Sequence, residues 1–226
     1  MTTADNGTTD GVPLDRQRSA HSDQPAGPWH KPTLRAHARR LRAAAITQDE
    51  SGTLLSQAVT RRIAASDQFA AATTVLTYVA FGSEVDLRSL HDAYDGPVGA
   101  AGRKRFAVPL THAPDSRLTF HLLAGADLRT SRSGFREPLA AAPQVPLHEV
   151  DLVLVPGLAF AVDGTRLGYG KGFYDRFLAE LRTAFPAVPT VGVTIDALVF
   201  DALPQDPHDV AVTHLATESG LRPVGG

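Results

Sequence analysis

The sequence predicts an α/β protein: an open, mostly parallel sheet flanked by helices in a Rossmann-like three-layer arrangement, built as a single domain. Two observations support this fold class. Apolar, β-branched stretches alternate along the chain with segments of helical spacing, a pattern typical of parallel strands joined by crossover helices. The stretch VDLVLVPGLAF, from Val150 to Phe160, is also continuously apolar, as expected for a strand buried on both faces of such a sheet.

The composition indicates a soluble, cytoplasmic protein. Of the 226 residues, 43% are hydrophobic and 20% charged, and the formal net charge is −2 at pH 7. No overall field therefore favours nucleic acid or a membrane surface, and we expect neither as a partner. The absence of cysteine excludes disulfides, thiolate zinc sites and cysteine nucleophiles. No apolar run is long enough to span a membrane, and the N-terminus lacks a signal-peptide pattern.

The N-terminal part divides into a tail and two helices. Residues 1–28 are rich in Thr, Asp, Gly, Ser and Pro and nearly free of large apolar side chains, so we expect a disordered tail followed by an α/β domain over residues 29–222. The segment TLRAHARRLRAA carries apolar residues at helical spacing, which predicts a basic helix. The sequence TQDE has the capping-box pattern and predicts a second helix from Thr47 to about Ala65.

The remaining elements follow from the same rules. DLRSLHDAY predicts a short helix, and apolar residues at helical spacing from Phe173 onward predict another. Arg129–His148 contains three prolines and one glycine, which predicts a long irregular connection that is functional or mobile. Strands are predicted at Thr74–Phe81, in RFAVPL and RLTFHLL, at Val150–Phe160, at Thr190–Ile195 and at Asp209–Thr217.

The segment GTRLGYGKGFYDR, Gly164 to Arg176, is the strongest candidate for a binding site. It lies after a predicted buried strand and before a helix, where open α/β folds bind ligands. Its glycines allow close backbone approach, and Arg166 and Lys171 add charge beside a helix N-terminus, so the segment fits a phosphate. It matches neither the Walker A pattern nor the dinucleotide fingerprint. An ordinary glycine turn with solvated cations remains an alternative. Asp175 could bind Mg²⁺ beside the phosphate. Alternatively, its carboxylate only interacts favourably with the positive end of the helix dipole.

A longer motif carries a resemblance to a known family. VDLVLVPGLAFAVDGTRLGYGKGFYDRFL, from Val150 to Leu178, resembles the signature of 5-formyltetrahydrofolate cyclo-ligases, also called 5,10-methenyltetrahydrofolate synthetases. The stretches KPTLRAHARRLR, AFGSEVDL, SGFREP and LPQDPHDVAVTHLAT are similar to other family segments in the same order. The resemblance covers about Lys31 to Thr217.

The resemblance implies a reaction. ATP phosphorylates the formyl oxygen of 5-formyltetrahydrofolate, the second folate nitrogen attacks the activated carbon, and phosphate leaves, which gives 5,10-methenyltetrahydrofolate and ADP. Such an enzyme of one-carbon metabolism needs ATP as co-substrate and Mg²⁺, with cations and backbone donors to stabilise the transferring phosphoryl group. We expect a monomer.

The same resemblance assigns roles to individual residues. Lys171 and Arg166 are implied as catalytic cations, and Asp175 and Asp209 as Mg²⁺ ligands. Folate binding is implied for Val79, Glu84, Tyr169, Gly170, Lys171, Gly172 and Phe173. ATP binding is implied for Lys31, Pro32, Thr33, Leu34, Arg35, Arg166, Leu167, Gly168, Tyr169, Gly170, Lys171, Gly172, Phe173 and Tyr174.

The sequence departs from the family pattern after the proline of AVPL, where a basic residue is frequent and Leu110 stands here. Arg103, Lys104 and Arg105 are candidate substitutes for that cation. Glu84 has an alternative role as a cap of the helix that follows it.

Two other classes of protein remain open at this level. A non-catalytic binding module would be expected to lose at least one of Arg35, Lys171, Asp175 and Asp209, and all four are present. An isomerase or acyl-transfer relative would need a carboxylate beside the glycine loop. Glu137 is the candidate, although its proline neighbour favours a structural turn.

Overall fold

The computed structural model describes residues 30–48, 53–96, 102–112 and 115–225, so the predicted N-terminal tail lies outside it. The described residues form a seven-stranded sheet in the order β12-β11-β9-β6-β1-β2-β3. The helices are α1 (Lys31–Gln48), α2 (Thr53–Ala64), α3 (Asp67–Ala71), α4 (Arg88–Tyr94) and α5 (Phe173–Ala184). The strands of this sheet are β1 (Thr74–Leu76), β2 (Arg105–His112), β3 (Arg117–Leu122), β6 (Leu152–Pro156), β9 (Thr190–Val193), β11 (His214–Ala216) and β12 (Leu221–Pro223).

The sheet is mostly parallel, as predicted. The pairs β11·β9, β9·β6, β6·β1 and β1·β2 are parallel, and β3 and β12 add antiparallel edges. Two smaller sheets lie beside it. One contains β7 (Ala159–Ala161), β8 (Arg166–Leu167) and β10 (Val199–Phe200), and the other is a hairpin of β4 (Leu128–Thr130) and β5 (Arg136–Pro138).

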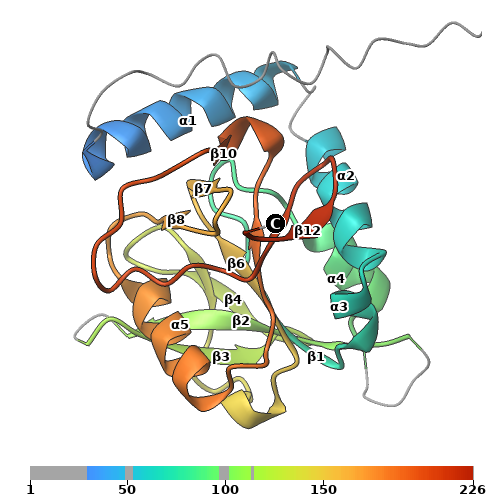
Figure 1. Cartoon of the computed structure of the whole chain (residues 1–226). Helices are drawn as coiled ribbons and strands as arrows, with labels where there is room; N and C mark the ends of the chain where they lie inside the picture. The colour runs from blue at the N-terminus through green and yellow to red at the C-terminus, as the bar shows by residue number, and fades with distance from the viewer. Residues whose placement is uncertain (1–29, 49–52, 97–101, 113–114, 226) are drawn as a thin grey trace, which may run out of the picture.

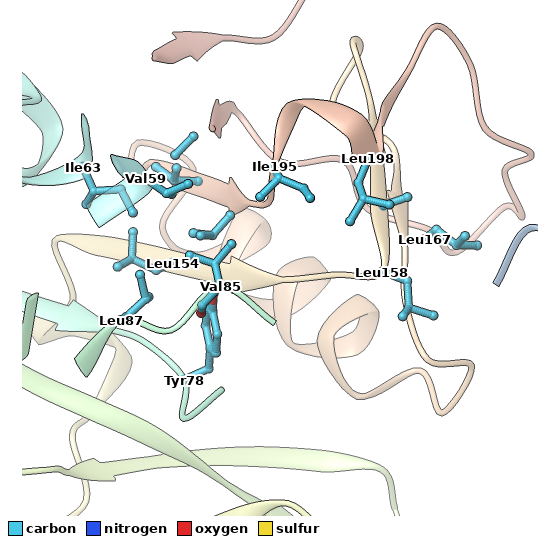
Figure 2. Close-up of a cluster of buried hydrophobic side chains, with 14 of the residues drawn as sticks. Val59, Ile63, Tyr78, Val85, Leu87, Leu154, Leu158, Leu167, Ile195 and Leu198 are labelled. Atoms are coloured by element: carbon cyan, nitrogen blue, oxygen red, sulfur yellow. The ribbon is translucent and has the colours of Figure 1, made fainter. Parts of the chain in front are cut away.

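Helices cover both faces of the sheet, which confirms the three-layer prediction (Figure 1). In β6, Leu152 and Leu154 join a hydrophobic cluster that contains buried residues of α1, α2, α3 and α4. Val153 and Val155 point to the opposite face, in a cluster with Phe177 and other residues of α5. Alternate residues of one apolar strand therefore pack against different helix layers. Figure 2 shows part of the first cluster, where Val59 and Ile63 lie near Leu154.

The order of the strands creates a crevice between β1 and β6. From β1 the chain continues to β2 on one side, whereas β6, β9 and β11 follow one another on the other side. The helices that follow β1 and β6 therefore diverge, and ligands bind at the carboxyl ends of strands at such a switch point in open α/β sheets.

Two predicted strands are shorter than the sequence indicated. The prediction of one strand over Val150–Phe160 is wrong, because the chain leaves the main sheet at Gly157 and continues in β7. A β-carbon at Gly157 would lie 2.8 Å from the Phe160 ring, so only glycine fits this turn. The predicted strand from Thr74 ends at Leu76, because the following residues curl into a loop in which Tyr78 Oη donates to the carbonyl of Val85 at 2.9 Å.

Other boundaries also differ. The prediction that a helix begins at Thr47 is wrong: α1 continues to Gln48, consistent with the high helix propensity of the alanines at 43–45, and α2 begins at Thr53. The connection predicted as irregular contains the β4–β5 hairpin and a short 3₁₀ helix, η3 (Leu147–Glu149). A second 3₁₀ helix, η4 (Asp196–Leu198), follows β9. The last predicted strand is confined to His214–Ala216, and the sequence did not indicate α3 and β12.

A buried histidine makes the stability of this fold depend on pH. His91 of α4 is 8% exposed and lies 3.1 Å from Thr77 Oγ1, and burial lowers its pKa from 6.5 to about 4. The folded state therefore favours neutral His91. The stability contributed by burying the neutral ring is fully present above pH 6.5 and is lost as pH falls toward 4. We expect the free energy of unfolding to fall by about 3 kcal/mol over this range from this group. Denaturant unfolding of His91→Gln should show a correspondingly weaker pH dependence, whereas exposed His148→Gln should match the wild type.

Candidate active site

The predicted glycine loop connects β8 to α5. Gly170 and Gly172 have φ angles of 95° and 71°, a left-handed backbone that glycine adopts without strain. A β-carbon at Gly170 would also lie 3.2 Å from the guanidinium carbon of Arg35. Gly172 is the N-cap of α5, and no side chain caps the helix there. The loop therefore brings open backbone to a helix N-terminus, a place that favours anions.

Helix α1 supplies cations to this loop from a distant part of the sequence. Arg35 Nε donates to the carbonyl of Gly168 at 2.9 Å. Lys31 Nζ lies 2.6 Å from Asp206 and 2.5 Å from Asp209. Burial alone would lower the pKa of Lys31, but hydrogen bonds and charge from the two aspartates give a net raised pKa. Lys31 therefore keeps its positive charge at this end of α1.

The other residues predicted at the start of α1 differ in accessibility. Pro32 and Thr33 are exposed in its first turn. Leu34 is 4% exposed and belongs to the core, as does Leu167 of β8 at 2%. Their side chains therefore stabilise the elements that carry the site.

A largely buried ion pair joins the two ends of the loop. Arg166 Nη2 lies 2.7 Å from Asp175 Oδ1, with side-chain exposures of 5% and 20%. The Arg166 guanidinium carbon also lies 5.5 Å from the centre of the Tyr174 ring. Arg166 Nε and Tyr174 Oη are buried without a hydrogen-bond partner among the described residues. Both atoms belong to residues that line a cavity, and unsatisfied polar atoms of this kind are expected to bind a ligand or water.

Glu84 faces the glycine loop from the loop that follows β1. Its Oε1 accepts from Tyr169 Oη at 2.6 Å and its Oε2 from the Phe81 N–H at 2.9 Å. Burial raises the pKa of the Glu84 carboxyl, although these hydrogen bonds act in the opposite direction. The alternative role of Glu84 as a helix cap is wrong, because α4 begins at Arg88 and Leu87 at its N-cap position provides no side-chain cap.

Arg42 lines the larger cavity together with Glu84 and was not predicted as a site residue. It is 5% exposed, and its Nη2 donates to the carbonyls of Gly157 and Leu158 at 2.5 and 3.1 Å. Its charge also opposes the rise in the Glu84 pKa. In the sequence, Arg42 is one of several basic residues of a predicted helix, and such residues are usually exposed to solvent. No local pattern therefore indicated that it is buried in the site.

The β4–β5 hairpin covers the glycine loop. Lys171 Nζ donates to Ser133 Oγ at 2.7 Å and lies 5.6 Å from the centre of the Phe135 ring. Phe135 is also 4.6 Å from Phe81 and 6.2 Å from Tyr169, measured between ring centres. Three aromatic rings from three segments thus meet beside Lys171.

Two cavities meet at Glu84. The smaller, of about 100 Å³, lies between the glycine loop, β2 and β5, and its wall includes Arg166, Lys171, Asp175 and Glu137. The larger, of about 960 Å³, extends from Glu84 toward Arg42 and α2. Both include Tyr78, Val79 and Pro156. Ligand pockets typically measure about 300–1,000 Å³, so the larger space can hold a metabolite, and the smaller would have to open.

Glu137 lines the smaller cavity, although its proline neighbour in the sequence favoured a structural role. It lies in strand β5 and is 4% exposed, so the prediction of a structural turn at this point is wrong. Thr111 Oγ1 of the neighbouring β2 donates to its Oε1 at 2.5 Å.

The candidate substitutes for a cation at Leu110 lie at the opposite end of the sheet. Lys104 is 7% exposed and donates to the carbonyl of Ala72 at 2.5 Å. Arg105 pairs with Glu149 at 2.7 Å, and Arg103 donates to carbonyls at the end of α4. Because Arg105 stands opposite Thr74, the first residue of β1, these side chains lie at the amino ends of the strands. They do not replace the missing cation.

Within the described ranges, neither a preformed metal cage nor a membrane-spanning helix is present. No cluster of three or more His, Cys, Asp or Glu side chains there could enclose a metal ion, and Asp175 and Asp209 are paired with Arg166 and Lys31. None of the described helices is long and apolar enough to cross a membrane.

Comparisons of sequence and overall structure identify similar proteins. A 5-formyltetrahydrofolate cyclo-ligase of Mycolicibacterium smegmatis is 35% identical over 149 residues, which cover 64% of this chain and 73% of the relative. That of Escherichia coli is 29% identical over 183 residues, or 80% and 96% of the two chains. The NMR structure of the Aquifex aeolicus 5,10-methenyltetrahydrofolate synthetase superimposes with a TM-score of 0.64 at 28% identity, covering 84% of this chain and 93% of the other.

The family model described as the 5-formyltetrahydrofolate cyclo-ligase family matches residues 29–218. The relatives are named as ligases, which agrees with the predicted class of enzyme and gives no support to an isomerase or acyl-transfer role. Because the match spans far more than half of the sequence, the chain belongs to the 5-formyltetrahydrofolate cyclo-ligase family.

Proposed function

We propose that this protein catalyses the ATP- and Mg²⁺-dependent conversion of 5-formyltetrahydrofolate to 5,10-methenyltetrahydrofolate, with release of ADP and phosphate. The observation that carries the proposal is the meeting of the glycine loop and its cations with the Glu84 carboxylate around connected cavities. The direct test is incubation of the purified chain with 5-formyltetrahydrofolate and Mg-ATP, followed by the near-ultraviolet absorbance of the methenyl product. Absence of that absorbance at any protein concentration would contradict the proposal.

The polar groups of the site suit phosphoryl transfer. A formamide oxygen is a poor leaving group, and phosphorylation makes it a good one. The attacking nitrogen is part of the same molecule, so little positioning of a second reactant is needed. The protein must instead stabilise charge on the transferring group. Arg166 and Lys171 line the smaller cavity, whose described lining contains no Ser, Cys or His. We assign these two cations to the triphosphate, together with Lys31 and Arg35 of α1.

The folate side of the site centres on Glu84. The amino-pyrimidinone edge of a pterin presents adjacent N–H donors, and a carboxylate accepts such donors well. Val79 lines both cavities beside this position, and Tyr169 and Phe173 line the smaller one. In this proposal the pterin contacts Glu84, and the reacting formyl group points to Lys171.

The available donors fit a metal ion that arrives with the nucleotide. Mg²⁺ usually binds one or two carboxylates together with phosphate oxygens and water rather than an all-protein cage. Asp175 and Asp209 are two carboxylates of this kind and would hold the ion, which supplies charge neutralisation at the phosphates. The hydrogen bonds from Lys31 to Asp206 and Asp209 would then be partly replaced.

We expect Lys171→Ala to lower kcat by about 10²–10³-fold, because one charge contact to a transition state contributes roughly 3–4 kcal/mol. Lys171 is exposed, so the melting temperature should stay within a degree or so of the wild type. The matched control is Arg132→Ala, which removes an exposed cation of the neighbouring β4–β5 hairpin that lines neither cavity. A Lys171→Ala variant with kcat within threefold of the wild type would remove Lys171 from the mechanism.

We expect Glu84→Gln to raise the KM for 5-formyltetrahydrofolate at least tenfold and to leave the KM for ATP nearly unchanged. A hydrogen bond to a charged group contributes about 1.5–3 kcal/mol, and the amide places a donor where the pterin also donates. The control Tyr169→Phe removes the hydroxyl that donates to Glu84 but keeps the carboxylate, so its folate KM should change less. If the ATP constant alone rises, the two ligands are reversed across the loop.

A further inference from the structure

Glu137 is a buried carboxylate that the proposed chemistry has not yet used. It is 4% exposed and forms part of the wall of the smaller cavity, together with Lys171 and Arg166. In the β4–β5 ladder the backbone of Glu137 stands opposite that of Arg129. The Glu137 side chain is oriented by Thr111 of β2. A buried carboxylate normally pairs with a cation or receives several hydrogen bonds. Among the described residues, Glu137 has no ion pair, and its one hydrogen bond comes from the Thr111 hydroxyl at 2.5 Å.

The other carboxylates of this cavity are already engaged. Asp175 forms the ion pair with Arg166 at 2.7 Å. Glu84 accepts hydrogen bonds at both of its oxygens, from Tyr169 and from the Phe81 N–H. The described lining of the smaller cavity contains no histidine. Glu137 is therefore the carboxylate of this wall that is both oriented by a second residue and free to accept a proton, which is the arrangement expected of a general base.

The reaction releases one proton that must be accepted. The second folate nitrogen carries a hydrogen in 5-formyltetrahydrofolate and none in the methenyl product. After phosphorylation, this nitrogen donates its electron pair to the activated carbon, so a new C–N bond forms while the nitrogen still holds its hydrogen. Loss of that proton leaves the nitrogen neutral. The first nitrogen then returns its electron pair to the carbon, the bond from carbon to the phosphate oxygen breaks, and phosphate leaves with the bonding electrons.

We propose that Glu137 is the catalytic base of ring closure: its carboxylate takes the proton from the attacking nitrogen, and Thr111 is the residue that positions it. This inference rests on the proposed function and extends it to the second chemical step. Lys171 and Arg166 then act on phosphoryl transfer, whereas Glu137 acts on the closure that follows. The two steps would thus depend on groups from different elements, the glycine loop and β5.

Single-turnover rapid quench with excess protein separates the two steps, because ADP reports phosphoryl transfer and the methenyl absorbance reports closure. For Glu137→Gln, which keeps an acceptor for Thr111, we expect ADP formation within threefold of the wild-type rate and closure slowed at least 100-fold, in line with the 10²–10⁴-fold effect typical of general bases. Thr111→Val keeps the carboxylate but removes its orienting hydroxyl, and should slow closure selectively by about tenfold. Exposed Glu180→Gln in α5 is the control and should match the wild type.

Each result has a defined meaning. Closure at the wild-type rate in Glu137→Gln would overturn the inference and assign the proton to a phosphate oxygen or water. Equal slowing of both steps would also overturn it, since a residue that only supports the cavity affects both. If circular dichroism shows that Glu137→Gln is unfolded, Thr111→Val decides alone, by selective loss of closure or its absence. Failure of the proposed function itself is distinct, because the wild-type protein would then form no methenyl product.

Discussion

The geometry of the site depends on one buried guanidinium. Arg42 is 5% exposed, and its charge is compensated by the carbonyls of Gly157 and Leu158 rather than by a direct carboxylate partner among the described residues. A buried cation is tolerated only when its donors are satisfied, so these carbonyls must point to Arg42. They lie where β6 ends and the β7–β8 hairpin begins. The orientation of that turn therefore determines where Arg166 and the glycine loop emerge.

Two further cations on the same face of helix α1 fix other segments of the site. Arg35, two helical turns before Arg42, donates to Gly168 in the loop, and Lys31 reaches the segment before β11 through Asp206 and Asp209. Residues at this spacing project from the same side of a helix. The buried side chains of Leu34 and Ala38 hold that side against the core. A single helix thus connects three separate parts of the site, which explains why a segment so far away in sequence belongs to it.

The sequence predicted the layers of this fold and the position of the glycine loop, but not the ends of its strands. Apolar runs identify which segments enter the sheet, whereas strand ends depend on tertiary contacts such as the hydrogen bond from Tyr78 to Val85 and the packing of Phe160 over Gly157. The same limit applies to the site. Arg42 and Glu137 belong to residue types that are usually exposed, and their burial follows from packing between elements that no local pattern encodes. The roles of the glycine-loop residues remain predictions that mutation must test.

Lys171 and Arg166, two cations of the site, differ in how readily they can exchange partners. Lys171 is exposed, and its contact with Ser133 is a hydrogen bond to a neutral hydroxyl, so an arriving phosphate can replace it at little cost. Arg166 and Asp175 are far less exposed, and removing one partner of a buried pair leaves a charge that is expensive to keep unpaired. Arg166 is therefore expected to stay paired as a fixed wall of the site, while Lys171 moves from the hairpin to the ligand. Because Lys171 and Phe135 are in contact, that movement would also weaken the contact between the glycine loop and the hairpin. Under the proposed function, nucleotide binding would then be coupled to access to the smaller cavity.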